Sequence, residues 1–201
     1  MSSLPALPDR VLLPLHFDVP RMQADLKRLE AGEWMQHFVK QNFDGDWSII
    51  PLRGTAGATH PVLMMYSDPS CTEFADTPFL ARCEYFPEVL GAFPFPLDAV
   101  RLMKLTPGSL IKEHRDHDLA FECGAVRIHV PVTTNPGVDF RLNGTRLDLR
   151  EGTSWYLRLS DRHSVENHGK TDRVHLVIDA RRSPELEAWI ATLDVETEVA
   201  A

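Results

Sequence analysis

Long apolar runs, closely spaced cysteine pairs and an excess of basic residues are all missing from this chain of 201 residues. None of the apolar stretches approaches the roughly 20 residues that a membrane-spanning helix needs. Prolines interrupt the N-terminal stretch MSSLPALPDRVLLPLHF, where a secretion signal needs a continuous apolar core. The sequence therefore predicts a soluble protein with no membrane partner.

The few cysteines bear on the compartment. Cys71, Cys83 and Cys123 form neither a close pair nor a spacing typical of a metal site. An odd number of well-separated cysteines favours free thiols in a reducing compartment. We therefore expect a cytoplasmic location, and we interpret Asn143-Gly144-Thr145 as a turn and not as a glycosylation site.

The charge balance argues against nucleic acid as a partner. Lys and Arg number 21 against 29 Asp and Glu, for a formal net charge of -8, whereas nucleic-acid affinity depends on clustered basic residues. A local basic pocket for a small anion stays open, because several arginines gather in the second half of the chain. These are Arg115, Arg127, Arg141, Arg158, Arg162 and Arg173.

The length fits one domain, which we divide into an N-terminal region (1–97), a β core (98–182) and a C-terminal helix with its tail (183–201). From Asp98 onward, short apolar runs alternate with turn signals, as in an antiparallel sandwich or barrel. Asn143-Gly144 marks the clearest hairpin, since these residues accept the positive φ angles of a type I′ turn. The expected strands are 99–105, 125–132, 138–142, 145–149, 154–159 and 173–180.

The flanking regions predict helices and loops. A strand over 9–19 leads into a helix that starts at Pro20 and ends at Gly32, and a second strand passes through Trp47, Ile49 and Ile50. Residues 54–59 and 60–81 are expected to be loops. A short helix is expected over 86–91, and a last helix follows Ser183-Pro184-Glu185.

Three potential metal ligands stand in the β core. His114 and Asp116 are one residue apart, so on an extended segment both side chains project to the same side. With His163 they form the two-imidazole, one-carboxylate set that holds non-haem Fe(II) and leaves positions open. Taken separately, HRDHD fits a solvated charge cluster and His163 a capped turn residue.

Further cationic groups alternate along two expected strands. Arg173 opens the run RVHLVIDA and offers a fork for a carboxylate; its alternative is to extend its stem outward to solvent. Arg127 and His129 share one face of another strand and could hold a second carboxylate, although an exposed sheet face with a salt bridge is the better explanation of that pair taken alone.

These pieces together resemble the aspartyl/asparaginyl β-hydroxylase family, whose relatives include bacterial hydroxylases of free L-proline. The resemblance rests on PGSLIKEHRD, AVRIHVPV, WYLRLSDRHSVEN and RVHLVID, which follow one another in family order over residues 98–182. It implies a mainly β double-stranded β-helix, the jelly roll of Fe(II)- and 2-oxoglutarate-dependent oxygenases, with flanking N- and C-terminal helices.

The resemblance also implies roles for individual residues. His114, Asp116 and His163 correspond to the iron ligands, and Arg173 to the arginine that binds the distal carboxylate of 2-oxoglutarate. Arg127 and His129 correspond to the pair near the carboxylate that chelates iron. Met103 departs from members that place a hydroxyl near the co-substrate, and the candidates for a substitute helper are Thr106, Ser109 and Tyr156.

The implied activity is hydroxylation of an unactivated C–H bond of an amino acid or amino-acid side chain, with Fe(II), 2-oxoglutarate and O₂ consumed to give succinate and CO₂. A cation facing the open side of the iron is expected to hold the substrate, and the candidates are Arg53, Arg115, Arg141 and Arg162. Aromatic and amide residues of the N-terminal region either cover the substrate or pack in the core: Trp34, His37, Asn42 and Trp47.

Two other classes fit part of the pattern. A cupin-like metalloenzyme or zinc hydrolase would use the same three ligands without a keto acid, but neither needs the buried dicarboxylate clamp that Arg173 and the Arg127/His129 pair suggest. A non-catalytic jelly-roll binding protein would have no need for an intact set of metal ligands. The sequence favours neither a monomer nor an oligomer.

Overall fold

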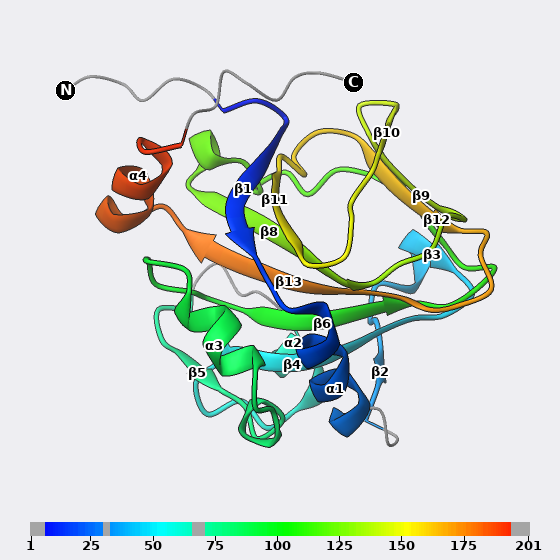
Figure 1. The fold of residues 1–201 in the computed structure, drawn as a ribbon, viewed down its shortest axis with the longest axis horizontal. Helices are drawn as coiled ribbons and strands as arrows, with labels where there is room; N and C mark the ends of the chain where they lie inside the picture. Colours follow the sequence, from blue (N-terminus) through cyan, green and yellow to red (C-terminus); the bar gives the residue numbers. More distant parts are fainter. Residues whose placement is uncertain (1–6, 30–32, 66–70, 194–201) are drawn as a thin grey trace.

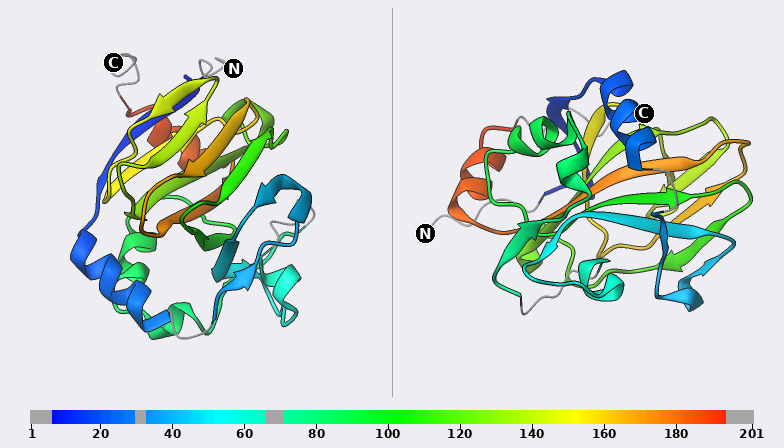
Figure 2. Two further views of the ribbon diagram at one scale, coloured as in Figure 1. Left: turned by 90° about the vertical axis from the view of Figure 1, so that its right-hand side faces the viewer. Right: turned by 90° about the horizontal axis from the view of Figure 1, so that it is seen from below.

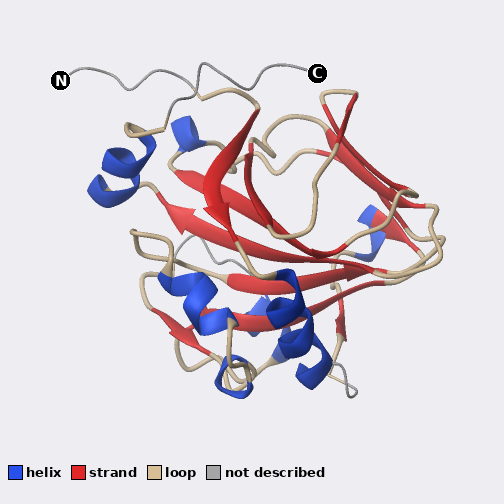
Figure 3. Cartoon of the chain, viewed as in Figure 1, coloured by secondary structure: helices blue, strands red, loops and turns tan. Residues whose placement is uncertain are grey.

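The structure is a computed structural model that describes residues 7–29, 33–65 and 71–193. In it, two antiparallel sheets face each other. Helices lie at the periphery and strands fill the centre (Figure 3). The larger sheet contains, in spatial order, β1 (Arg10–His16), β11 (Thr153–Leu157), β8 (Ala125–Thr133), β13 (Arg173–Arg181), β6 (Val100–Leu105), β4 (Trp47–Thr55) and β2 (Met35–Gln36), and β5 (Phe74–Asp76) pairs with β4. The smaller sheet contains β10 (Thr145–Leu147), β9 (Val138–Leu142), β12 (His163–Asn167), β7 (Leu110–His114) and β3 (Phe43–Asp44).

The helices cover the outer side of the larger sheet and its ends (Figure 1). They are α1 (Val19–Leu29), α2 (Pro61–Met65), α3 (Phe86–Gly91) and α4 (Pro184–Ile190), with short 3₁₀ turns η1 (Lys40–Asn42), η2 (Leu80–Arg82) and η3 (Phe121–Cys123). No described helix is long and apolar enough to cross a membrane. All three cysteines are free thiols.

Two apolar layers hold these elements together. One lies between the larger sheet and α1, α3 and α4, where Met22, Phe86 and Leu186 are almost fully buried. The other lies between the two sheets, which face each other in Figure 2. Strand β13 is buried along eight of its nine residues because it borders both layers. Its inward side chains therefore point into the space between the sheets, where the candidate site lies.

The expected mainly β jelly roll with flanking helices is confirmed. The strand over 138–142 and the helix over 86–91 have the expected bounds, and Asn143 and Gly144 have φ angles of 52° and 77°, as a type I′ turn requires. Ser183 caps α4 by accepting from the N–H of Leu186. The expected helix end at Gly32 lies outside the described residues.

Several local expectations are wrong. Strand β4 continues to Thr55, so Gly54 is not in a loop, and α2, β5 and η2 occupy parts of the expected loop over 60–81. Strands β7 and β12 were not expected at all. LIKEH and HSVEN each contain a single well-buried apolar residue, Ile111 and Val165, so apolar residues do not alternate along them; the other buried residues of β12, His163 and Asn167, are polar. These two strands pair with each other and carry two of the three potential metal ligands.

The sheets cross the boundary that we placed at residue 97. Strands β1, β2, β4 and β5 of the N-terminal region pair within the larger sheet, and β3 pairs with β7 in the smaller one. The division of the chain into regions therefore does not correspond to separate layers, and we keep the single domain as a proposal.

Candidate metal centre

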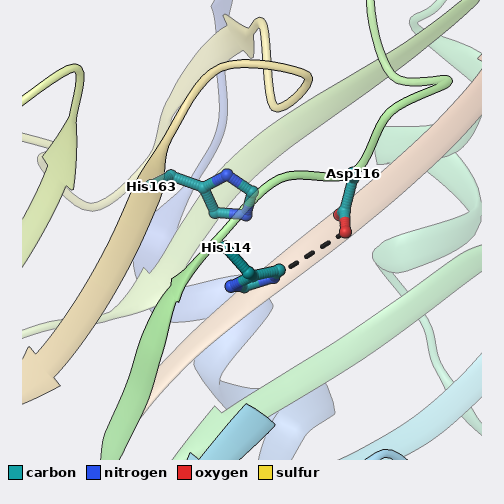
Figure 4. Close-up of side chains that lie close together, drawn as sticks. All are labelled: His114, Asp116 and His163. Carbon is teal, nitrogen blue, oxygen red and sulfur yellow. Dashed lines mark ion pairs between the residues drawn. The ribbon is translucent and has the colours of Figure 1, made fainter.

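The side chains of His114, Asp116 and His163 come together (Figure 4). One ligand atom from each residue lies within 4.8 Å of the other two. His114 ends β7 and His163 begins β12, and the two residues are cross-strand partners. Asp116 follows β7 in an irregular segment, and its N–H donates to the carbonyl of Leu159.

Backbone contacts orient both imidazoles. Nδ1 of His114 lies 2.7 Å from the carbonyl oxygen of Lys112, and Nδ1 of His163 lies 3.0 Å from that of Asp161. A carbonyl only accepts, so each Nδ1 carries the proton and each Nε2 keeps its lone pair. Metal-binding histidines are typically fixed by such a contact on the other ring nitrogen. Burial lowers the pKa of His163, and the neighbouring His114 lowers it further, which favours the neutral, ligating form.

The third group, Asp116, presents its two oxygens to different neighbours. Oδ2 accepts from Nη1 of Arg127 at 2.9 Å, and Oδ1 lies 3.7 Å from Nε2 of His114. One carboxylate oxygen therefore faces the histidines while the other is held by a cation. This donor set fits a divalent metal ion with open coordination positions.

A cavity connects this cluster to Arg173. It is lined by Trp47, Met103, Ile111, His114, Asp116, Arg127, His129, Phe140, Leu159, His163, Val165 and Arg173. Arg173 is only 2% exposed, and among the described residues it has no carboxylate partner. Burial lowers the pKa of Arg173 to about 9, because an unpaired guanidinium is poorly stabilised away from water.

A chain of side-chain contacts joins this guanidinium to two histidines. Nη2 of Arg173 donates to Nδ1 of His175 over 2.7 Å, and Nδ1 of His129 lies 3.2 Å from Nδ1 of His175. Nε of Arg173 and Nε2 of His129 have no hydrogen-bond partner within the described part of the chain. Burial, and then the charge of Arg173, lower the pKa of both histidines well below the usual value. The cavity thus contains one buried cation with an unused donor at Nε of Arg173, a good match for a carboxylate.

The structure brings Arg127 and His129 to the same cavity, but they differ in how they are engaged. The three donor nitrogens of Arg127 already bind Asp116 and Asp179. Burial alone lowers the pKa of Arg127, but the two carboxylates outweigh it and raise the pKa above the usual value. His129, in contrast, has a side-chain nitrogen, Nε2, without a hydrogen-bond partner among the described residues. Within this pair, His129 is therefore the residue with a nitrogen available to a ligand.

None of the proposed hydroxyl helpers lines this cavity. The hydroxyls of Thr106 and Ser109 lie 2.9 Å apart, and Ser109 accepts from the N–H of Asp46. Tyr156 belongs to the outer apolar layer, where its oxygen accepts from the N–H of Phe121. The expectation of a hydroxyl among these three is wrong for the structure described, and the group beside Arg173 is His175.

A larger pocket opens on the other side of His114 and Asp116. Its lining includes His37, Phe38, Asn42, Trp47, Met65, Asp98, Arg101, Met103, Arg127, Asp179 and Arg181. His37, Asn42 and Trp47 thus lie where substrate-covering residues were expected, with Trp47 stacked on His37 at 3.7 Å between ring centroids. Trp34 instead packs against Lys104.

The four arginines expected to hold a substrate do not reach this pocket. Each contacts a partner elsewhere. Arg53 pairs with Asp76, and Arg115 donates to the carbonyl of Ser160. Arg141 pairs with Asp139, and Arg162 pairs with Glu113. The arginines that do line the pocket are Arg101, Arg127 and Arg181. Arg101 and Asp179 were missed, although a charged residue inside an otherwise apolar strand, as in VRLMKL and RVHLVIDA, signals a buried ion pair.

The fold is the jelly roll of the 2-oxoglutarate- and Fe(II)-dependent oxygenases. Similar structures include an oxidoreductase of the 2OG-Fe(II) oxygenase family from Burkholderia pseudomallei, with 15% identity, coverage of 87% of this chain and 86% of that one, and a TM-score of 0.52. A Pseudomonas putida prolyl-4-hydroxylase is 13% identical, with coverage of 87% of this chain and 93% of that one, and a TM-score of 0.54. HygX from Streptomyces hygroscopicus, with nickel and 2-oxoglutarate bound, is 11% identical, with coverage of 88% of this chain and 84% of that one, and a TM-score of 0.54. At these identities the likeness shows the fold.

Within that class the chain belongs to the aspartyl/asparaginyl beta-hydroxylase family, whose sequence profile matches residues 17–183. An L-proline cis-4-hydroxylase from Rhizobium meliloti (strain 1021) is 25% identical over 183 residues, which cover 89% of this chain. The chain spans 62% of the length of that relative.

Proposed function

We propose that the protein is an oxygenase dependent on Fe(II) and 2-oxoglutarate that hydroxylates a C–H bond of an amino acid or amino-acid side chain. The observation that carries the proposal is one cavity lined by two different kinds of group. His114, Asp116 and His163 offer metal ligands to it, and the buried, carboxylate-free guanidinium of Arg173 lines the same cavity.

The residues divide the work as follows. His114, Asp116 and His163 hold the metal, and Arg173 binds the distal carboxylate of 2-oxoglutarate with His129 as a neighbouring polar group. When bound, Fe(II) together with 2-oxoglutarate and O₂ supplies the oxidation, and the co-substrate leaves as succinate and CO₂. Trp47, Leu159 and Phe140 line the cavity and limit the access of water.

The substrate then approaches through the larger pocket beside His114 and Asp116. The relative that acts on L-proline makes a free amino acid the first substrate to test. We place the activity in a single domain and, given three free thiols, in the cytoplasm.

The test is an anaerobic titration of the purified protein with Fe(II) and 2-oxoglutarate, followed by visible absorption. We expect a weak charge-transfer band that needs both additives and is absent from Asp116→Ala and His163→Ala. Tight zinc binding with no band on addition of 2-oxoglutarate would instead indicate a cupin-like metalloenzyme without a keto acid. Free proline, aspartate, asparagine and short peptides are then compared by the succinate released above the uncoupled background.

A further inference from the structure

Four alternating charges lead from the metal centre into the larger sheet. Asp116 accepts from Arg127 at 2.9 Å, and Arg127 donates to both oxygens of Asp179 at 2.7 and 3.0 Å. Arg101 then donates to Asp179 from the opposite side and to the carbonyl of Met65. The side chains of Arg101 and Asp179 are each 5% exposed, that of Arg127 is 14% exposed and that of Asp116 is 31% exposed. All four residues border the larger pocket, and the exposure of their side chains rises from Arg101 and Asp179 to Asp116.

Asp116 depends on this network more than the two histidines do. His114 and His163 lie on paired strands, and a backbone carbonyl fixes each ring. Asp116 lies outside any strand, and its carboxylate accepts a hydrogen bond from Arg127. That bond occupies Oδ2 and turns Oδ1 toward His114. The direction of the carboxylate is therefore set by the position of the guanidinium.

Asp179 in turn sets the position of that guanidinium. It lies directly opposite Arg127 in the pairing of β13 with β8, and its two oxygens receive Nε and Nη2 in a bidentate fork. A fork fixes both the place and the plane of a guanidinium, which a single contact does not. Only Nη1 is then left to reach Asp116.

We propose that Asp179 is a positioning residue of the metal centre, which acts through Arg127 to hold one oxygen of Asp116 and present the other to the metal. This inference rests on the proposed function, since it needs a metal at His114, Asp116 and His163. Asp179 does not touch the metal. Groups that orient metal ligands from the outer shell typically change metal affinity by about 10- to 100-fold when they are removed.

The experiment titrates metal-free protein with Co(II) and records visible absorption and the quenching of tryptophan fluorescence. Asp179→Asn keeps the shape of the side chain but removes its charge and half of the fork. We expect it to weaken Co(II) binding by about 10- to 100-fold, whereas His163→Ala loses the cobalt spectrum. Asp25→Asn is the matched control, because Asp25 is another fully buried carboxylate but contacts α3 and not the metal centre. It should leave Co(II) affinity unchanged.

A double-mutant cycle separates positioning from a general loss of structure. If Asp179 acts through Arg127, Asp179→Asn has no further effect on Co(II) affinity in an Arg127→Met background. Full additivity of the two losses, or unchanged affinity in Asp179→Asn alone, would overturn the inference. Failure of the parent protein to bind Co(II), or equal binding by His163→Ala, would refute the metal centre itself and with it the proposed function.

Folding of the variant is controlled separately, because removal of the Asp179 carboxylate leaves Arg101 without its carboxylate partner and Arg127 with Asp116 alone. The pair Arg101→Met and Asp179→Asn removes one charge of each sign and keeps the network neutral. Circular dichroism of the metal-free protein shows whether this double variant folds. It should bind Co(II) as weakly as Asp179→Asn, and tight binding by the folded double variant would overturn the positioning role.

Discussion

Nη2 of Arg173 donates a hydrogen bond to Nδ1 of His175 over 2.7 Å. The two side chains can meet because residues two apart on strand β13 lie on the same face. Because Nδ1 accepts this bond, it carries no proton, and His175 is held neutral. The only charged group of the pair is therefore the guanidinium. A cation with a neutral partner inside the protein is poised to receive an anion.

The first prediction concerns the response of this cation to 2-oxoglutarate. Arg173→Met removes the guanidinium and keeps most of the apolar stem, so we expect 2-oxoglutarate affinity to fall by at least ~30-fold, as for other truncated buried charge contacts. Metal affinity should stay the same, since Arg173 contacts none of the three ligands. Isothermal titration with 2-oxoglutarate, in the presence of Co(II), measures the first quantity, and titration with Co(II) alone measures the second.

Arg173→Met should also change how the melting temperature responds to 2-oxoglutarate. Ligand binding raises the melting temperature in proportion to the logarithm of ligand concentration, so 2-oxoglutarate should stabilise the parent protein and not Arg173→Met. Without the ligand, the variant should be no less stable than the parent, because it no longer buries an unpaired charge. Equal loss of metal and 2-oxoglutarate binding would mean that Arg173 supports the structure instead.

Acid should destabilise the metal-free protein through its buried histidines. Burial, and then the charge of Arg173, lower the pKa of His129 and His175 well below 6.5. The unfolded chain therefore takes up protons near pH 6.5 that the folded chain does not, and the free energy of unfolding falls as the pH drops below that value. Each such histidine contributes up to about 1.4 kcal/mol per pH unit.

Urea unfolding at pH 7.5, 6.5 and 5.5 measures this slope. His175→Gln is the matched variant, since its amide oxygen still accepts from Arg173 but does not titrate. We expect a shallower loss of stability between pH 6.5 and 5.5 in this variant. An identical slope in the two proteins would show that His175 is protonated in the folded state.

The strands and the metal ligands differ in how far the sequence could predict them. Strand 138–142 was predicted with its bounds because apolar residues alternate along it and Asn143-Gly144 defines its turn. Strands β7 and β12 were not predicted, because each contains only one well-buried apolar residue. Their positions are fixed by pairing with neighbouring strands, β7 with β3 and β12 with β9. Long-range pairing of this kind leaves no local pattern.

At the candidate site, the types of residue in the sequence predicted the metal ligands, but not the ion pairs among the surrounding side chains. Two histidines and one aspartate in family order were enough to predict the cluster around His163. That Arg127 binds Asp116 and Asp179 depends on β8 lying next to β13, and the contribution of Arg101 depends on β6 lying on the other side. The order of strands in a sheet is a property of the whole chain, so these ion pairs could not be predicted from spacing.

Asp25 provides a test of the fold away from the site. It lies on α1 and accepts from the N–H groups of Glu84, Tyr85 and Phe86, so it caps α3, whose own N-cap residue supplies no side-chain hydrogen bond. Burial alone raises the pKa of Asp25, but these donors and Arg28 outweigh it and lower the pKa. The stabilisation is therefore present above about pH 4 and is lost as the pH falls further.

Asp25→Asn should cost about 2–3 kcal/mol, because a fully buried, charged acceptor of three backbone N–H groups becomes a neutral one. For a chain of this size that lowers the melting temperature by roughly 5–10 °C. Co(II) affinity should be unchanged. A melting temperature within a degree of the parent would show that α3 is capped in another way.

Trp47 forms the wall shared by the cavity and the larger pocket, and its ring offers the last prediction. It stacks on His37 at 3.7 Å and meets Phe43 edge-on at 5.8 Å, while its Nε1 has no hydrogen-bond partner among the described residues. Trp47→Phe keeps an aromatic face and removes an unpaired donor, so the free energy of unfolding should change by less than about 1.5 kcal/mol. Trp47→Ala should cost about 3–5 kcal/mol and join the two spaces, which would raise uncoupled succinate release relative to Trp47→Phe. Equal losses of stability in both variants would mean that the indole N–H, and not the ring stack, holds this wall in place.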